Sequence, residues 1–251
     1  MRRSLLNLIL AVPFLFMACN GNDDDYSLDK YWLDIATVEN PESSNAFYIM
    51  RDDSVRLWMA APTSTTYRPK DGQRIIANYT ILNDKPDGSN YNHDMRLNSV
   101  YEVLTKGIFE ITPATKDSIG NDAIEITSMW VGSKSHFLNV EFRFYGFNKM
   151  HFINLVHDAD KTYSDGKIHL EFRHNNNNDE PAYRQNGIAS FDLRSLQDPA
   201  NDTSLKIVVH TNEYGADKEK THELTYKYGN ATASSVAPKK SFAATNWVEV
   251  Q

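Results

Sequence analysis

The sequence predicts an all-β protein whose short strands form a sandwich or a barrel. Three observations predict this fold class. Apolar and polar residues alternate over many short segments, as in a strand with one buried face and one solvated face. Turn-forming residues separate these segments at short, regular intervals. Long segments of helical periodicity are absent from residue 31 onward.

Composition supports a folded chain and excludes some partners. The 251 residues are 41% hydrophobic and 12% aromatic, with one Cys and a formal net charge of −7. This apolar share is enough for a packed core, which argues against disorder. The acidic balance argues against nucleic acid, because such binding requires Lys and Arg to neutralise phosphates. We therefore expect no nucleic-acid partner.

Residues 1–18 predict a lipoprotein signal peptide. Two arginines precede the apolar run Leu5–Ala18, which is shorter than the roughly 20 residues of a membrane span. The run ends in Leu15-Phe16-Met17-Ala18-Cys19, which resembles a bacterial lipobox, although Phe16 stands where an aliphatic residue is usual. Cleavage before Cys19 would leave an acylated N-terminus that anchors the chain. The alternative is a plain secretory signal followed by a chance Cys.

Residues 19–30 form an acidic tether behind Cys19. The tether contains three consecutive carboxylates, Asp23, Asp24 and Asp25. An acidic triplet at this position resembles the surface-export signal of Bacteroidota lipoproteins. It implies a protein anchored by lipid in the outer membrane and facing the cell exterior. A solvated spacer with no export role would have the same composition.

Residues 31–112 predict a first β domain. Asp52-Asp53 separates two strand-like segments and predicts a hairpin. The segment Asn83–Asp94 carries Pro, Gly and Asn and predicts a polar loop. The expected strands are Trp32–Val38, Ala46–Arg51, Val55–Ala60, Arg74–Leu82, Ser99–Leu104 and Ile108–Ile111.

Residues 113–121 are polar and turn-rich, and they predict a linker, although a long hairpin loop would look the same. The second domain is expected over residues 122–251. Its alternating segments are Ile124–Trp130, Leu138–Tyr145, Ile168–Arg173, Ala189–Leu193, Leu205–Val209 and Leu224–Tyr228. Alternation places Ile124, Ile126, Ser128 and Trp130 on one face, and Asn139, Glu141, Arg143 and Tyr145 on a solvated face. Phe242, Trp247 and Val250 offer a final strand.

Four parts of the chain, taken together and in order, resemble the NigD-like lipoproteins of the Bacteroidota. They are Tyr31–Val38 after the acidic tether, Gly72–Ile76 leading into Tyr79, Phe137–Phe142 followed by His151–Val156, and Leu170–Asn175 with Ala189–Leu193. The resemblance covers nearly the whole mature chain. It implies an N-terminal OB-like barrel and a C-terminal antiparallel β-sandwich. It implies no catalytic residues, and a fold by itself does not supply a function.

Motifs for catalysis and metal binding are incomplete. His222-Glu223 begins like a zinc-protease motif, but the second His is missing, and adjacent strand residues face opposite ways. Asp158–Thr162 begins like a calcium loop, but Tyr163 stands where an EF-hand needs Gly. Asn175–Glu180 is rich in oxygen ligands, and a hairpin loop explains it better than a weak calcium site. We expect no metal, no cofactor and no enzymatic activity.

Two triplets, Asp53-Ser54-Val55 and Asp117-Ser118-Ile119, resemble the O-glycosylation motif of exported Bacteroidota proteins. They make Ser118 and Ser54 candidate modification sites, although a chain of this length contains about one such triplet by chance.

The leading functional hypothesis is a non-catalytic envelope lipoprotein that binds an unknown envelope protein or glycan. A dedicated glycan-binding lipoprotein and an unrecognised hydrolase are the alternatives. The polar loops Asn83–Asp94 and Asn175–Glu180 are candidate contact surfaces, because loops on a rigid scaffold often carry recognition. Solvated turns explain both loops equally well.

Overall fold

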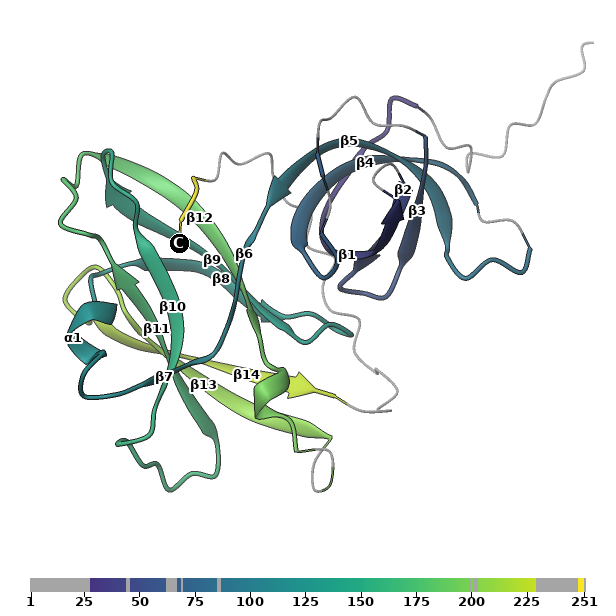
Figure 1. Ribbon diagram of the computed structural model, residues 1–251. Coiled ribbons are helices and arrows are strands. Elements are labelled where there is room, and N and C mark those ends of the chain that lie inside the picture. Colours follow the sequence, from purple (N-terminus) through teal and green to yellow (C-terminus); the bar gives the residue numbers. More distant parts are fainter. Residues whose placement is uncertain are drawn as a thin grey trace, which may run out of the picture.

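The chain folds into a β-barrel followed by a β-sandwich (Figure 1). The computed structural model describes residues 28–43, 46–61, 67–68, 70–84, 87–198, 200, 203–228 and 248–250. Cys19, the acidic triplet, Phe242 and Trp247 lie outside these residues. No helix in the part of the chain that is described has the length and apolarity to cross a membrane. The predicted all-β fold class is confirmed.

The barrel contains five strands that close on themselves. They are β1 (Trp32–Ser43), β2 (Ala46–Arg51), β3 (Arg56–Ala61), β4 (Arg74–Asp84) and β5 (His93–Glu102). Their order is β1-β2-β3-β5-β4, with β4 pairing back to β1 and β3 running parallel to β5. This is a five-stranded barrel of the OB type. Its interior holds Val38, Ile49, Leu57, Ile75 and Met95, all fully or almost fully buried.

The sandwich contains two sheets. Its strands are β6 (Leu104–Gly107), β7 (Phe109–Ile111), β8 (Glu125–Val131), β9 (Phe137–Gly146), β10 (Phe152–Asp158), β11 (Ile168–Asn175), β12 (Tyr183–Asp192), β13 (Ser204–Asn212) and β14 (Glu219–Lys227). One sheet has the order β6-β12-β9-β8 and the other β14-β13-β11-β10-β7. Phe142, Phe172, Phe191 and Val209 fill the space between them. The short helices are α1 (Lys116–Ile119) and η1 (Arg194–Leu196).

The sandwich is not antiparallel throughout. Three strand pairs, β6 with β12, β7 with β10, and β11 with β13, run parallel. Strand β10 was not among the expected strands, because its pattern does not alternate. Leu155 and Val156 are adjacent and both fully buried, Leu155 in the sandwich core and Val156 under α1 on the other face.

The junction between the two units lies near Val103. The prediction that residues 113–121 link the two domains is therefore wrong. Strands β6 and β7 precede residue 113, yet they already pair with sandwich strands. The segment 113–121 instead contains α1, whose Ile119 packs against Ile111 and Val156. Its polar residues form the solvent side of this short helix, and that is why the segment resembles a linker in sequence.

The barrel packs against the outer face of the four-stranded sheet. Ile35 and Ile76 of the barrel cluster with Val103 and Ile188, and Trp130 packs against this cluster. The prediction that Trp130 shares a face with Ile126 is therefore wrong. A β-bulge between Ile126 and Ser128 shifts the register of β8 on β9 and reverses the alternation.

Candidate functional site

A buried polar joint connects the two units. The carboxylate of Asp52, in the β2–β3 hairpin, accepts hydrogen bonds at 2.8 and 3.0 Å from the guanidinium of Arg74 on β4. It also accepts one at 2.9 Å from the amide of Asn139 on β9. The Asn139 oxygen in turn accepts from Ser190 at 2.7 Å and from Arg74 at 3.0 Å. Arg74 and Asn139 are fully buried, so Asn139 does not lie on a solvated face as the alternation predicted.

The same hairpin fixes the β8–β9 loop of the sandwich. The Asp52 backbone oxygen accepts a hydrogen bond from Ser133 Oγ at 2.9 Å and another from the Lys134 backbone N–H at 3.1 Å. A Cβ at Gly132 would lie 2.7 Å from Asp52 Cγ and 2.1 Å from Ser135 Oγ. Only glycine therefore allows the Asp52 side chain to approach this loop so closely.

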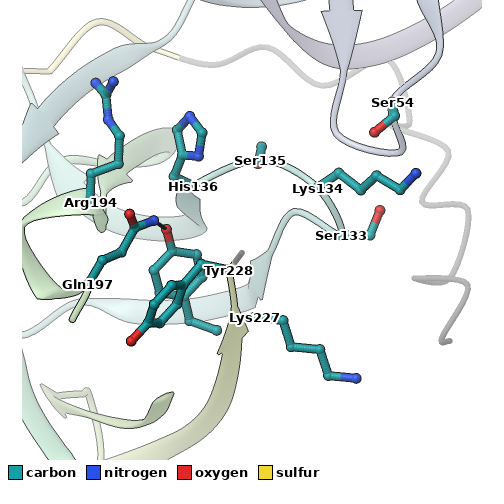
Figure 2. A pocket seen from close by; sticks show the side chains of 10 residues that line it. Ser54, Ser133, Lys134, Ser135, His136, Arg194, Gln197, Lys227 and Tyr228 are labelled. Atoms are coloured by element: carbon teal, nitrogen blue, oxygen red, sulfur yellow. Dashed lines mark hydrogen bonds between the residues drawn. The ribbon is translucent and has the colours of Figure 1, made fainter. Parts of the chain in front are cut away.

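An open pocket of about 480 Å³ lies beside this joint and is lined by both units (Figure 2). Figure 2 shows Ser54 approaching from the barrel hairpin, the loop from Ser133 to His136 along one wall, and Arg194 on the side opposite Lys134. We call this the junction pocket. Its lining residues are Ser54, Ser133, Lys134, Ser135, His136, Arg194, Gln197, Tyr226, Lys227 and Tyr228.

The junction pocket is locally positive on an acidic chain. Within the described residues, the ammonium groups of Lys134 and Lys227 have no hydrogen-bond or ion-pair partner. Arg194 differs, because its guanidinium binds the carboxylate of Asp192 at 2.9 Å. Burial and then the charge of Arg194 lower the pKa of His136, which disfavours a positive charge on its imidazole. Two lysines therefore supply the uncompensated charge.

The lining groups of the junction pocket are arranged for hydrogen bonding rather than for nucleophilic attack. Ser133 Oγ donates to a backbone oxygen, and Ser135 Oγ accepts from the Phe137 N–H at 3.5 Å. Among these described lining residues, no hydrogen bond joins His136 to a serine hydroxyl. Activation of a serine requires such a contact with a base. The pocket offers hydroxyl, amide and ammonium groups to a ligand.

A second polar cluster, the buried histidine chain, closes the far end of the sandwich. His151 Nδ1 lies 2.8 Å from His174 Nε2, and His151 Nε2 lies 3.2 Å from Asp179 Oδ2. Asp179 also accepts from the Phe147 backbone N–H at 2.5 Å. Burial, and then the neighbouring imidazole, lower the pKa of His174 to about 4. Hydrogen bonds from the backbone and from His151 hold the pKa of Asp179 below its usual range.

A third cluster, the surface histidine chain, lies on the outer face of the five-stranded sheet. His169 Nδ1 is 2.8 Å from His210 Nε2, and His169 Nε2 is 3.0 Å from Asp165. The ring of Tyr163 stacks on His169 with centroids 3.5 Å apart. A cavity of about 240 Å³ adjoins it, but the cations there are paired, since Lys161 and Arg173 both bind Glu171.

Two pairs of exposed aromatic side chains lie near the far end of β9. Tyr145 packs edge-on against Tyr214, with ring centroids 5.6 Å apart, and Phe147 lies 5.9 Å from Tyr183. Each of the four is more than 40% exposed. We call this group the aromatic patch.

The structure places the candidate glycosylation residues in different settings. Ser54 lies in the β2–β3 turn with φ of 70° and lines the junction pocket, whereas Ser118 is exposed on α1 and donates to the Thr115 backbone oxygen. The loop Asn175–Glu180 is more than a solvated turn, because Asp179 points inward. His222 and Glu223 bind different partners, Glu213 and Lys167.

Apart from Ser54, sequence reasoning missed the residues that make the junction pocket. No motif marks Asp52, Lys134, His136 or Lys227, and the structure brings them together from separate loops and strands. Among the residues that the structure describes, no group of three or more His, Cys, Asp or Glu side chains is placed to hold a metal ion.

Comparison with known proteins divides the chain where the structure does. A family model for a NigD-like N-terminal OB domain matches residues 35–103, and one for a NigD-like C-terminal beta sandwich domain matches residues 107–226. No curated protein matches the chain.

Solved structures are similar over most of the chain. A protein of unknown function from Bacteroides vulgatus is 29% identical with a TM-score of 0.68, covering 86% of this chain and 97% of its own. A candidate toxin-related protein from Parabacteroides distasonis is 31% identical with a TM-score of 0.65, covering 79% and 94%. A NigD-like immunity protein from Bacteroides caccae, at 18% identity and a TM-score of 0.59, covers 79% and 92% and shares the fold.

Proposed function

Because this chain belongs to the NigD-like family, with both of its domains in order, we propose that it is a lipid-anchored envelope protein that binds a ligand without transforming it. The family resemblance seen in the sequence is confirmed, and so is the pairing of an OB domain with a β-sandwich. The ligand, the absence of turnover and the location in the envelope are our proposals.

The junction pocket is the single observation that carries the binding role. It is open, it is lined by both units, and a buried ion pair fixes its walls before any ligand arrives. Preorganised polar groups of this kind bind a ligand at little cost in conformational entropy. Catalysis would also need a nucleophile in contact with a base, or an acid and a base placed close together. The described lining residues offer binding groups without such a pair.

The location follows from the N-terminal sequence. Cys19 would carry the lipid, and Asp23, Asp24 and Asp25 would direct the protein to the outer membrane and its exterior face. Replacing Cys19 by Ala should release the protein from the membrane fraction and abolish uptake of labelled fatty acid. Equal membrane retention of wild type and variant would contradict lipid anchoring.

Surface display has its own test. Replacing the three aspartates by Ala should leave fatty-acid labelling intact and protect the protein from protease added to whole cells. If the triple variant is cut as readily as the wild type, the acidic triplet is a spacer without an export role.

The absence of turnover is tested on the purified protein. Incubation with envelope glycans and peptides should return them unchanged, as measured by mass spectrometry. If hydrolysis appears, and one carboxylate substitution removes it, the protein is an enzyme and the binding proposal fails.

Binding of a neutral glycan at the aromatic patch is a second candidate, because exposed aromatic faces stack on sugar rings. Tyr183 and Tyr214 are 62% and 41% exposed, and amide-rich loop residues lie nearby in 175–180. In gels containing a neutral polysaccharide, Tyr183→Ser with Tyr214→Ser should lose retardation. Tyr163→Ser is the matched control, since Tyr163 is equally exposed at 43% but lies by the other sheet. Equal retardation of both variants would dismiss the patch.

A further inference from the structure

We infer that the junction pocket binds an acidic carbohydrate, a sugar that carries a carboxylate or sulfate group. This inference rests on the proposed function, since it names the ligand of the same site. Charge, the chemistry of the lining and the rigidity of the walls each support it.

The charge of the pocket favours an anion. Lys134 and Lys227 are among its lining residues, and no carboxylate among the described residues pairs with either ammonium group. Some lysines elsewhere are paired with a carboxylate, as Lys161 is with Glu171 and Lys167 with Glu223. On a chain with a net charge of −7, two unpaired lysines at one pocket form a local attraction for a negative group.

The lining favours a sugar as the carrier of that negative group. The other groups are the hydroxyls of three serines and two tyrosines, the amide of Gln197 and the imidazole of His136. No aliphatic side chain is among the described residues that line it. A hydrophobic peptide anchor would leave these polar groups without hydrogen-bond partners. A ligand rich in hydroxyl groups can replace its water contacts with hydrogen bonds to these side chains.

The size and rigidity of the pocket suit one part of a glycan chain. Its volume of about 480 Å³ lies within the range of small-ligand sites, and its open mouth lets a longer chain continue into solvent. The backbone N–H of Lys134, not its side chain, binds Asp52. The lysine side chain can therefore be removed without breaking the contact that fixes the loop.

Titration calorimetry on the full-length lipoprotein in detergent tests this inference. The probes are a trigalacturonate and a sulfated trisaccharide, with a neutral galactose trisaccharide, sodium sulfate and sodium phosphate for comparison. We expect at least one acidic trisaccharide to bind, and the neutral sugar and the free ions to bind at least tenfold more weakly. Added salt should weaken the acidic complex, because the pocket is open to screening ions.

Variants assign the binding to the pocket. Lys134→Ala with Lys227→Ala should weaken the acidic complex at least tenfold. The matched control is Lys70→Ala with Lys218→Ala, which removes the same charge from two exposed lysines outside the pocket and should change the affinity less than twofold. Ser54→Gly, which tolerates the positive φ of this turn, should weaken sugar binding and leave binding of sulfate unchanged.

Several outcomes would overturn the inference. These are no binding of either acidic trisaccharide, equal affinity for the neutral sugar or for free sulfate, or equal losses in the pocket and control variants. Product analysis of the same samples keeps the two proposals apart. Intact sugars without binding reject the acidic-carbohydrate ligand alone, whereas cleaved sugars reject the non-catalytic role.

Discussion

The buried and the surface histidine chains of the sandwich each consist of two histidines and one aspartate. The two clusters have similar geometry but differ in burial. In each, the central imidazole lies 2.8 Å from a second imidazole through Nδ1 and contacts an aspartate through Nε2, at 3.2 Å in the buried histidine chain and 3.0 Å in the surface histidine chain. The side chains of His151 and Asp179 are each 1% exposed, whereas those of His169 and Asp165 are 10% and 42% exposed.

The partners of the two aspartates differ as well. Asp179 accepts hydrogen bonds from the backbone of Phe147 and Asn148, so it ties the β9–β10 turn to the β11–β12 loop. Asp165 accepts from the backbone of Lys167, two residues away in its own turn. Asp179 therefore connects two loops that are distant in sequence, whereas Asp165 binds groups within four residues of itself. If burial decides how much such a cluster contributes to stability, then variants of buried and exposed groups should differ in the stability that they lose.

The carboxylate that pairs with a fully buried guanidinium should give the largest effect. Asp52→Ala would leave the fully buried guanidinium of Arg74 without its anion, which costs about 3–5 kcal/mol in comparable buried pairs. Urea unfolding should report this loss. The neighbouring Asp53 pairs with Arg51 at 2.7 Å but is 39% exposed, so Asp53→Ala should cost less than about 1 kcal/mol. Similar losses in the two variants would mean that burial is not the deciding quantity.

The two histidine chains give the next effect. Asp179→Ala should lower the melting temperature by about 10 °C, because it leaves the imidazole of His151 and two backbone N–H groups without their acceptor. Asp165→Ala should lower it by less than about 2 °C, since water replaces an exposed carboxylate. Scanning calorimetry of the two variants compares them directly. A larger shift for Asp165→Ala would reverse the interpretation of both clusters.

Alternation in the sequence predicted most strands, because a strand with one buried face has period two. It failed where both faces are buried or the backbone is irregular. The bulge between Ile126 and Ser128 turns Trp130 toward the barrel, and Leu155 and Val156 face two different apolar layers. Asn139 follows the alternation but is covered by the barrel. None of these causes is visible in a local pattern, because each depends on a distant segment.

The candidate site could not be predicted from the sequence for the same reason. Asp52 meets Arg74 across 22 residues and Asn139 across 87. The sequence predicted the hairpin that carries Asp52, but it gave no sign that this carboxylate, rather than Asp53, turns inward. The histidines of both chains likewise looked ordinary, since His151 and His174 are 23 residues apart and His169 and His210 are 41 apart.

The two histidine chains should also differ in how much stability the protein loses in acid. The pKa of His174 is about 4 in the folded protein, below its usual value of about 6.5. Between these values the unfolded chain binds the additional proton, so this contribution is complete above pH 6.5 and is lost as the pH falls toward 4. The full loss is about 3 kcal/mol. Urea unfolding at pH 7, 6 and 5 should show the decline, and His174→Gln should reduce its slope.

The matched control for acid is His210→Gln in the surface histidine chain. Burial and then the neighbouring His169 also lower the pKa of His210, so its effect has the same sign. It should be smaller, because His210 is only half-buried and water can solvate its charged form. A slope that changes more in His210→Gln than in His174→Gln would contradict the role of burial.

The smallest effect is local and concerns single amides. Phe147 N–H donates to Asp179 at 2.5 Å and Lys167 N–H donates to Asp165 at 3.1 Å, so each aspartate has one amide that reports on it. Because exchange needs the amide to reach water, we expect the Phe147 amide to exchange with deuterium at least tenfold more slowly than the Lys167 amide. Asp165→Ala should speed exchange at Lys167 alone. Asp179→Ala should speed it at Phe147 and also at Asn148, the second amide that the same carboxylate holds. Faster exchange at Phe147 in the Asp165→Ala variant would mean that the two chains are coupled through the sheet, and the comparison between independent buried and exposed clusters would no longer hold.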